Sequence, residues 1–167
     1  MKSIFDETNL KGKKLKNRIF RSATWMSMAD ENGHVSSDVV DLYKQYSQGE
    51  VAAIITGITS IHEDGEKLKG IACFHDDSYI EENRRIADAV HEDSALIFLQ
   101  SAIVDLPGNV FGERINNLTK EEISDIVTKF KNSAVRAKKA GFDGIQIHAA
   151  HFFYLSKFIS PLVNKRE

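Results

Sequence analysis

The sequence of 167 residues is poor in cysteine, proline and tryptophan, with one, two and one of each. The single cysteine, Cys73, lacks an internal disulfide partner and has no neighbour at metal-ligand spacing, so we predict an inert thiol in a reducing compartment. Long apolar runs are also missing. No window approaches the roughly 18 apolar residues of a membrane span, and the charged amino terminus does not resemble a signal peptide. These absences predict a cytoplasmic protein with no membrane contact.

Neither sign of charge dominates, because 22 lysine and arginine residues face 24 acidic ones for a formal net charge of -2. A nucleic-acid-binding surface needs a basic excess, so we predict no nucleic-acid partner and favour a small molecule. Neither a GxGxxG motif nor a P-loop is present, which weakens the case for a dinucleotide-binding fold. With 42% hydrophobic residues, the chain can bury the core of one domain, residues 1–167.

Short apolar segments alternate with segments of helical periodicity along the whole chain. After a hairpin turn at residues 10–13, the predicted strands cover residues 19–24, 51–58, 95–100 and 144–148. The predicted helices follow the first three strands, at residues 37–49, 79–92 and 119–140, and a long loop covers residues 105–117. This alternation predicts an α/β fold with a parallel sheet, either open and doubly wound or part of a (β/α)8 barrel. Since a whole barrel takes about 250 residues, four βα units amount to half of one.

Two of the helices carry end signals. Ser36 or Ser37 can cap the first helix. The third helix has a capping box at Thr119 and Glu122, ends in basic residues, and is followed by Gly141 as a left-handed cap. Its predicted apolar stripe consists of Ile123, Ile126, Val127, Phe130, Ala134 and Ala137.

Polar residues stand where the predicted strands end, and in parallel α/β folds these ends form the site. They are Ser22, Thr24, Thr56, Gly57, Thr59, Gln100, His148 and His151. A glutamine amide offers both donors and an acceptor, which suits a heterocycle with adjoining carbonyl and NH groups, although an amide that ties down a loop explains Gln100 equally simply.

The two histidines raise a more specific question. A zinc protease uses His-Glu-x-x-His, whereas His148 and His151 are separated by two alanines with no carboxylate, so we predict no metal site. Two neutral imidazoles can instead donate hydrogen bonds to an anionic oxygen or polarise a carbonyl group. Purely structural histidines remain the alternative. The aromatic residues that follow, Phe152, Phe153, Tyr154 and Phe158, favour a core role over a stacking platform.

Four blocks of the chain resemble the old yellow enzyme family of FMN-dependent NAD(P)H oxidoreductases. They are LKNRIFRSATWMSMADENGHVSSD, YKQYSQGEVAAIITGITSI, IFLQ and GFDGIQIHAAHFFYLSKFISPLVNKRE, and together they resemble the amino-terminal half of a family member. The resemblance implies a (β/α)8 barrel with FMN at its carboxyl-terminal mouth. It also implies NAD(P)H as reductant and an unsaturated carbonyl compound, or a related acceptor, as the second substrate.

The resemblance also implies roles for individual residues. Ser22, Ala23 and Thr24 match positions that touch the flavin, and Gly57 and Ile58 match positions beside its ring system. Gln100 matches the glutamine that reads the pyrimidine edge of the flavin. His148 and His151 match the pair that holds the carbonyl oxygen of the acceptor.

The chain departs from the family pattern in two ways. Phe152 and Phe153 replace the usual Gly-Tyr, whose tyrosine is the proton donor in many members, and no catalytic role passes to Tyr154. Phe152 is also expected to add bulk near the pocket. In addition, the sequence contains no counterpart of strands five to eight. We therefore expect a partner, either a second copy in a homo-oligomer or a separately encoded second half-barrel. The alternative is a truncated, catalytically inactive relative that persists as an oligomeric or interaction protein.

Overall fold

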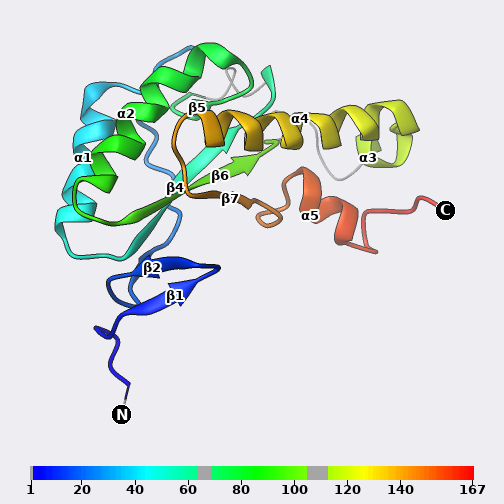
Figure 1. The fold of residues 1–167 in the computed structure, drawn as a ribbon. Helices are drawn as coiled ribbons and strands as arrows, with labels where there is room; N and C mark the ends of the chain where they lie inside the picture. The colour runs from blue at the N-terminus through cyan, green and yellow to red at the C-terminus, as the bar shows by residue number, and fades with distance from the viewer. Residues whose placement is uncertain (1, 64–68, 105–112) are drawn as a thin grey trace.

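The computed structural model of the protein describes residues 2–63, 69–104 and 113–167. Its centre is a sheet in which strands lie in the order β3-β4-β6-β7, with β5 paired to β4 (Figure 1). The strands are β3 (Phe20–Arg21), β4 (Ala53–Ser60), β5 (Ala72–Cys73), β6 (Leu96–Ala102) and β7 (Gly144–Ile147). Every pairing in this sheet is parallel, as the alternation of elements predicted.

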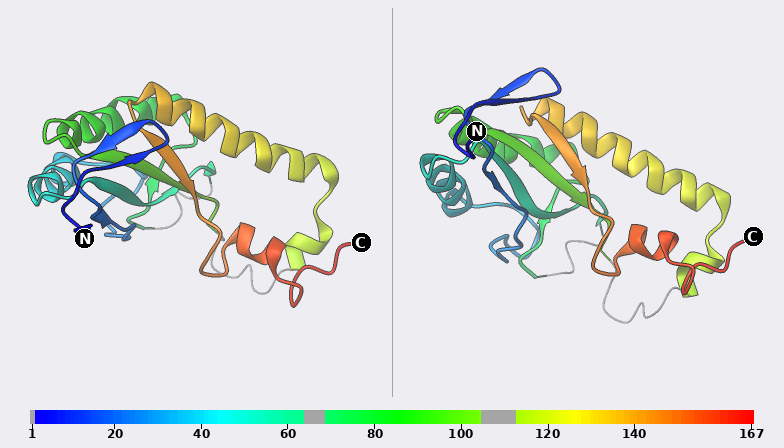
Figure 2. Two further views of the ribbon diagram at one scale, coloured as in Figure 1. Left: turned by 60° about the horizontal axis from the view of Figure 1, so that its bottom comes forward. Right: turned by 90° about the horizontal axis from the view of Figure 1, so that it is seen from below.

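The long helices cover one face of the sheet. The helical elements are α1 (Ser37–Gln48), the 3-10 turn η2 (Asp77–Tyr79), α2 (Ile80–His91), α3 (Glu113–Asn117), α4 (Lys120–Lys139) and α5 (Tyr154–Ile159). Figures 1 and 2 show α1, α2 and α4 side by side on the same side of β4, β6 and β7. A doubly wound sheet carries helices on both faces, whereas a (β/α)8 barrel carries them only outside. The one-sided arrangement is that of a partial barrel.

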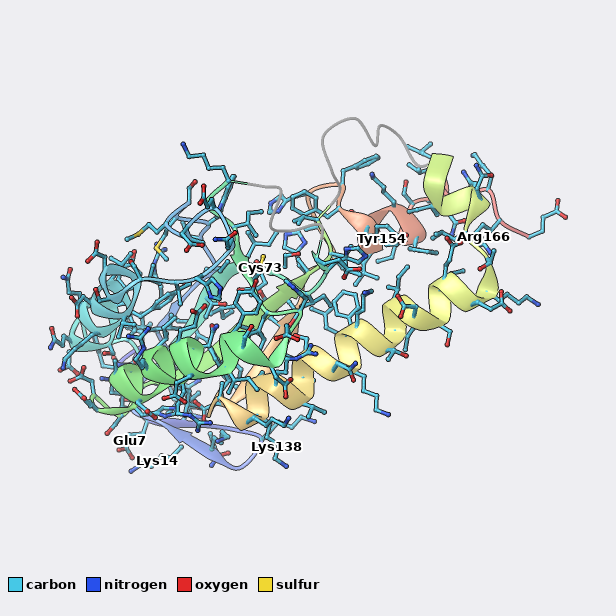
Figure 3. The ribbon with its side chains drawn as sticks, turned by 90° about the horizontal axis from the view of Figure 1, so that it is seen from above. Glu7, Lys14, Cys73, Lys138, Tyr154 and Arg166 are labelled. Atoms are coloured by element: carbon cyan, nitrogen blue, oxygen red, sulfur yellow. The ribbon has the colours of Figure 1, made fainter. Side chains whose placement is uncertain are left out.

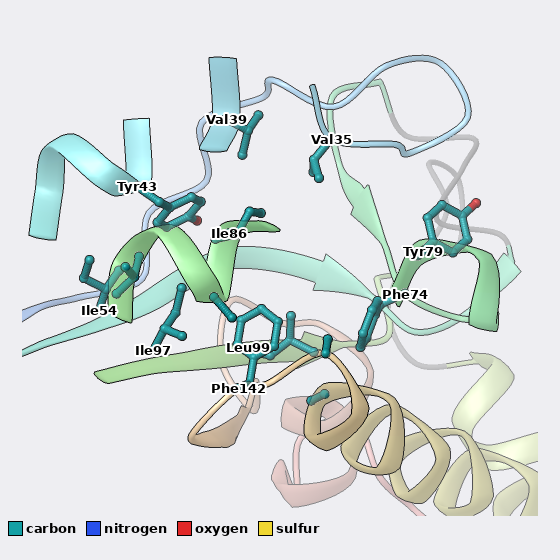
Figure 4. Packing of buried hydrophobic residues seen from close by; sticks show 14 of the residues in the cluster. Val35, Val39, Tyr43, Ile54, Phe74, Tyr79, Ile86, Ile97, Leu99 and Phe142 are labelled. Carbon is teal, nitrogen blue, oxygen red and sulfur yellow. The ribbon is translucent and has the colours of Figure 1, made fainter. Parts of the chain in front are cut away.

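The main core lies between these helices and the sheet. Ile54 of β4 and Ile97 and Leu99 of β6 point toward the helices and are fully buried there (Figure 4). The neighbouring residues Ala53 and Phe98 point to the other face, because side chains alternate along a strand.

An antiparallel hairpin, β1 (Thr8–Leu10) and β2 (Lys13–Leu15), covers part of that other face. Its turn at Lys11 and Gly12 was predicted from the sequence and is confirmed. Leu15 of the hairpin is buried against Ala53. The hairpin therefore closes one end of the inner side of the sheet.

Helix α4 has both of the end structures that the sequence predicted. Thr119 Oγ1 accepts from the N–H of Glu122 at 3.1 Å, and the carboxylate of Glu122 accepts from the N–H of Thr119 at 2.7 Å. At the other end, Gly141 has a φ of 89°, and Phe142 N–H donates to Ala137 at 3.0 Å, which completes a left-handed cap. Val127 was assigned wrongly to the buried stripe, since its exposed fraction is 63%.

Other boundaries differ from the predictions. Strand β3 is only two residues long, because the chain leaves the sheet after Arg21 and residues 22–24 pass over the end of β4. Ser36 occupies the N-cap position of α1, but its side chain makes no capping hydrogen bond. Of the predicted loop 105–117, residues 105–112 lie outside the described residues, and the remainder forms α3. Strand β5 and helix α5 were not predicted.

The carboxyl-terminal segment packs against α3 (Figure 3). The guanidinium group of Arg166 donates to the backbone carbonyl oxygens of Ile115 at 2.9 Å and Leu118 at 2.6 Å. Asn116 exchanges hydrogen bonds with the backbone of Val163 and Lys165. These bonds satisfy carbonyl groups at the end of a short helix and fix the segment after α5.

The described residues contain neither a candidate membrane span nor a candidate metal cluster. None of the described helices is both long and apolar enough to cross a bilayer. Within the same ranges, no three histidine, cysteine, aspartate or glutamate side chains come together as a metal site would require.

Candidate active site

A cavity of about 560 Å³ lies at the carboxyl ends of the strands. Its lining residues come from the segment after β3, from β4 and β6, from the segments before β5 and from the turn after β7. They are Ala23, Trp25, Ile58, Lys69, Ile71, Gln100, His148, His151 and Phe153. The cavity thus has mostly apolar walls with a few convergent polar groups, which is the usual make-up of a small-molecule site.

The family resemblance implied a role for eight residues, and the structure brings five of them together. Ala23, Ile58, Gln100, His148 and His151 all line this cavity.

The remaining three predicted residues lie beside it. Ser22 and Thr24 line a separate small hollow against α1. Gly57 supports the site through its backbone, since its N–H donates to the hydroxyl of buried Tyr43 at 2.8 Å. A Cβ atom at Gly57 would lie 2.7 Å from the carbonyl oxygen of Thr24, so only glycine permits this close approach.

Gln100 is held in place by two hydrogen bonds. Its backbone N–H donates to Thr56 Oγ1 at 2.9 Å, and its side-chain Nε2 donates to Oε1 of Gln146 at 2.6 Å. Gln146 lies opposite Gln100 in the parallel register of β6 and β7. The pairing leaves the carbonyl oxygen of the Gln100 amide and its second N–H for a ligand.

The two histidines contact each other directly. His148 Nε2 lies 2.9 Å from His151 Nδ1, and the backbone N–H of His148 donates to Ser101, which extends the parallel pairing by one residue. Burial of His148 and the nearby charge of His151 both lower the pKa of His148 below 6.5. His148 is therefore neutral at physiological pH and acts as a hydrogen-bonding group rather than a cation.

The aromatic residues after the histidines take three different positions. Phe153 lines the cavity, with its ring centroid 5.2 Å from that of His148. Phe152 is outside the cavity lining and 48% exposed, so the expected loss of space from its bulk is absent. Tyr154 is buried against Ile126 of α4 and Phe158 and is not among the residues that line the cavity.

The sequence analysis did not predict four of the residues that line the cavity, namely Trp25, Lys69, Ile71 and Phe153. Trp25 Nε1 donates to the carbonyl oxygen of Gly70 at 3.1 Å, which joins the segment after β3 to the turn before β5. The available sequence signal was the position of Trp25 immediately after a strand end. Nothing in the sequence places Lys69 near the histidines.

The donor set fits one part of a flavin. An amide with free donor and acceptor capacity matches the alternating carbonyl and NH groups of a pyrimidine edge, and Ala23 and Ile58 offer small apolar contacts for a flat ring. A phosphate would need several N–H donors or cations, and Lys69 is the only cation among the described lining residues. The described residues thus suit the ring system and supply little for the phosphate.

The chain is similar in sequence to known proteins along almost its whole length. The chain matches the NADH:flavin oxidoreductase / NADH oxidase family at residues 3–116 and 104–167. It is 32% identical to an NADH oxidase of Thermoanaerobacter brockii, over 98% of this chain and 28% of that protein. It is also 32% identical to an NADPH dehydrogenase of Listeria monocytogenes, over 100% of this chain and 54% of that protein.

The fold is also similar to that of a solved structure. Old Yellow Enzyme from Pichia sp. AKU4542 superposes with a TM-score of 0.87 at 20% identity, over 98% of this chain and 50% of that one. The predicted α/β half-barrel is thereby confirmed. The chain spans about half the length, or less, of these relatives, and it belongs to the NADH:flavin oxidoreductase / NADH oxidase family.

Proposed function

We propose that this chain forms the amino-terminal half of an FMN-dependent NAD(P)H oxidoreductase site that reduces the carbon-carbon double bond of an unsaturated carbonyl compound. The observation that carries the proposal is the convergence of Gln100, His148 and His151 in one apolar-walled cavity. When bound, FMN supplies the two-electron chemistry that connects NAD(P)H to the acceptor.

Different residues of the chain bind the cofactor and the acceptor. Gln100 would hold the pyrimidine edge of the bound ring system, and Ala23 and Ile58 would supply apolar contacts beside it. His148 and His151 hold the carbonyl oxygen of the acceptor and stabilise the negative charge that develops there. Phe153 has no proton to give, so the proton that completes the reduction comes from a group other than the residue at this position.

A second half-barrel completes the site in this proposal. Ile147 of edge strand β7 is 51% exposed, and the edge presents backbone groups that another strand can pair with. A separately encoded second half suits the site better than a second copy. Two copies in a homo-oligomer would repeat Gln100 and the histidines without adding phosphate-binding groups. NAD(P)H as reductant agrees with a cytoplasmic location.

The test is a visible absorption spectrum of the purified chain before and after incubation with excess FMN and gel filtration. Retained flavin absorbance that Gln100→Leu reduces supports the proposal. A colourless wild-type chain that stays colourless when the second half is supplied contradicts it. That result would favour the alternative, an inactive relative that persists as an oligomeric or interaction protein.

A further inference from the structure

Lys69 lines the cavity immediately before a turn whose glycine, Gly70, is tightly packed. The next residue, Gly70, is buried with a φ of 80°, and a Cβ atom there would collide with Ser27. The carbonyl oxygen of Gly70 also accepts the indole N–H of Trp25 at 3.1 Å. Beyond Gly70, buried Ile71 leads directly into β5. Contacts at Gly70 and Ile71 thus fix the backbone that directly follows Lys69.

The charge of Lys69 is uncompensated within the described part of the cavity. The other polar lining residues are Gln100, the two histidines and Trp25, and no aspartate or glutamate is among the described lining residues. No carboxylate of a described residue forms an ion pair with the Lys69 ammonium group. The wall therefore presents hydrogen-bond donors and one positive charge, but no described negative charge.

From this arrangement we propose that Lys69 makes the cavity selective for acceptors that carry a carboxylate or another anionic group. The inference rests on the proposed function, since it names the substrate class of the same site. An anion in the cavity gains a partner in Lys69, whereas a neutral isostere gains nothing from the charge. The ammonium group is exposed to water, so the gain is that of a solvent-screened ion pair, about fivefold in affinity at most.

The probe pair for the test is trans-cinnamate and trans-cinnamamide, which have the same shape and differ in charge. Trp25 is the only tryptophan of the chain and lines the cavity, so quenching of its fluorescence reports binding there. Dissociation constants for both probes are measured on the wild type, Lys69→Met and Lys69→Arg. Lys14→Met serves as the matched control, because Lys14 lies on the hairpin and pairs with Glu7.

We expect the preference for cinnamate over cinnamamide to fall about fivefold in Lys69→Met and to persist in Lys69→Arg and Lys14→Met. The affinity for cinnamamide stays the same in all four proteins. An unchanged preference in Lys69→Met overturns the proposal, and so does a lack of quenching by either probe in the wild type.

The same variants separate this proposal from the proposed function. Flavin retention after gel filtration tests FMN binding independently of the probes. If Lys69→Met weakens FMN relative to riboflavin and leaves the cinnamate preference unchanged, the charge serves the cofactor phosphate. The substrate proposal is then wrong while the proposed function stands.

Discussion

His148 Nε2 and His151 Nδ1 lie 2.9 Å apart, so one hydrogen bond joins the two rings. The other nitrogen of His148, Nδ1, accepts from the backbone N–H of Ala150 at 3.4 Å. The ring nitrogens of His148 and His151 that face each other are thus both engaged in the bond between the rings. A ligand oxygen that bonds to both rings must therefore break the bond between them first.

The first prediction concerns pH. The pKa of His148 is lowered in the folded protein by burial and by His151, so the unfolded chain binds a proton at a higher pH than the folded one. Stability is fully present above the ordinary value of 6.5 and is lost as the pH falls from there toward the folded pKa. We expect His148→Gln to lose less stability than the wild type between about pH 7.5 and about pH 5.5 in urea denaturation. Parallel losses in the two proteins would show that His148 does not titrate as described.

Much of the fold could be predicted from the sequence, because the residues that cap helices and the alternation of strand and helix patterns indicate the same arrangement. The capping box at Thr119 and the glycine at position 141 both mark the ends of α4, and the structure has the corresponding hydrogen bonds. Val127 was misplaced because periodicity does not say how wide the covered stripe is. Strand β5 is only two residues long, too short for an apolar pattern to identify it.

The site was predictable only in part. Gln100 and His148 stand at strand ends, and the common edge of a parallel sheet brings such residues together. Lys69 and Trp25 lie at the cavity because the indole of Trp25 donates to the carbonyl oxygen of Gly70. This hydrogen bond depends on the turn at Gly70, and a hydrophobic periodicity does not predict such a turn. Gln146 was overlooked because it lies inside a short strand, although parallel register places it opposite Gln100.

The second prediction concerns Asp143, which joins three elements just before β7. Its carboxylate accepts from Lys13 at 2.7 Å, from His91 at 2.9 Å and from the backbone N–H of Ile97 at 2.8 Å. Burial alone would raise the pKa of Asp143, but these bonds outweigh it and hold the pKa below 3.8. We expect Asp143→Asn to lower the free energy of unfolding by about 1–3 kcal/mol at neutral pH, because it removes the negative charge that pairs with Lys13 and weakens the other two bonds.

Urea denaturation measures this loss, and Asp77→Asn is the matched control. Asp77 also pairs with two cations, Arg136 and Lys139, but its side chain is largely exposed. Water screens that interaction, so the control should lose much less stability. Equal losses in the two variants would contradict the role given to Asp143. The wild type should also lose the stability from Asp143 as the pH falls below 3.8, since the folded pKa is the lower one.

The third prediction concerns Phe152, which has a φ of 61° where the family pattern usually has glycine. A side chain in the left-handed region costs about 1–2 kcal/mol, since Cβ approaches the following carbonyl group. We compare Phe152→Gly with Phe152→Ala, because both remove the ring and only one keeps Cβ. The glycine variant should be more stable by about 1 kcal/mol, after allowing for its greater freedom when unfolded. The control pair is Lys131→Gly and Lys131→Ala at an exposed position inside α4, where the alanine variant should be the more stable of the two. If alanine is the more stable residue at position 152 as well, Phe152 is not strained.

The last prediction concerns the bond between Gln100 and Gln146 and rests on the proposed function. Gln146 Oε1 accepts one amide N–H of Gln100 at 2.6 Å, which directs the other polar atoms of that amide toward the cavity. Gln146→Leu frees the Gln100 side chain to turn away, and we expect FMN to bind about threefold to tenfold more weakly, the value of one hydrogen bond. Gln100→Leu should weaken FMN binding at least as much. The double variant should bind FMN no more weakly than Gln100→Leu, because Gln146 acts through Gln100.

Flavin fluorescence titration measures the affinities, and urea midpoints should stay the same because both amides are reached by water. Additive losses in the double variant would mean that Gln146 contacts the flavin itself rather than positioning Gln100.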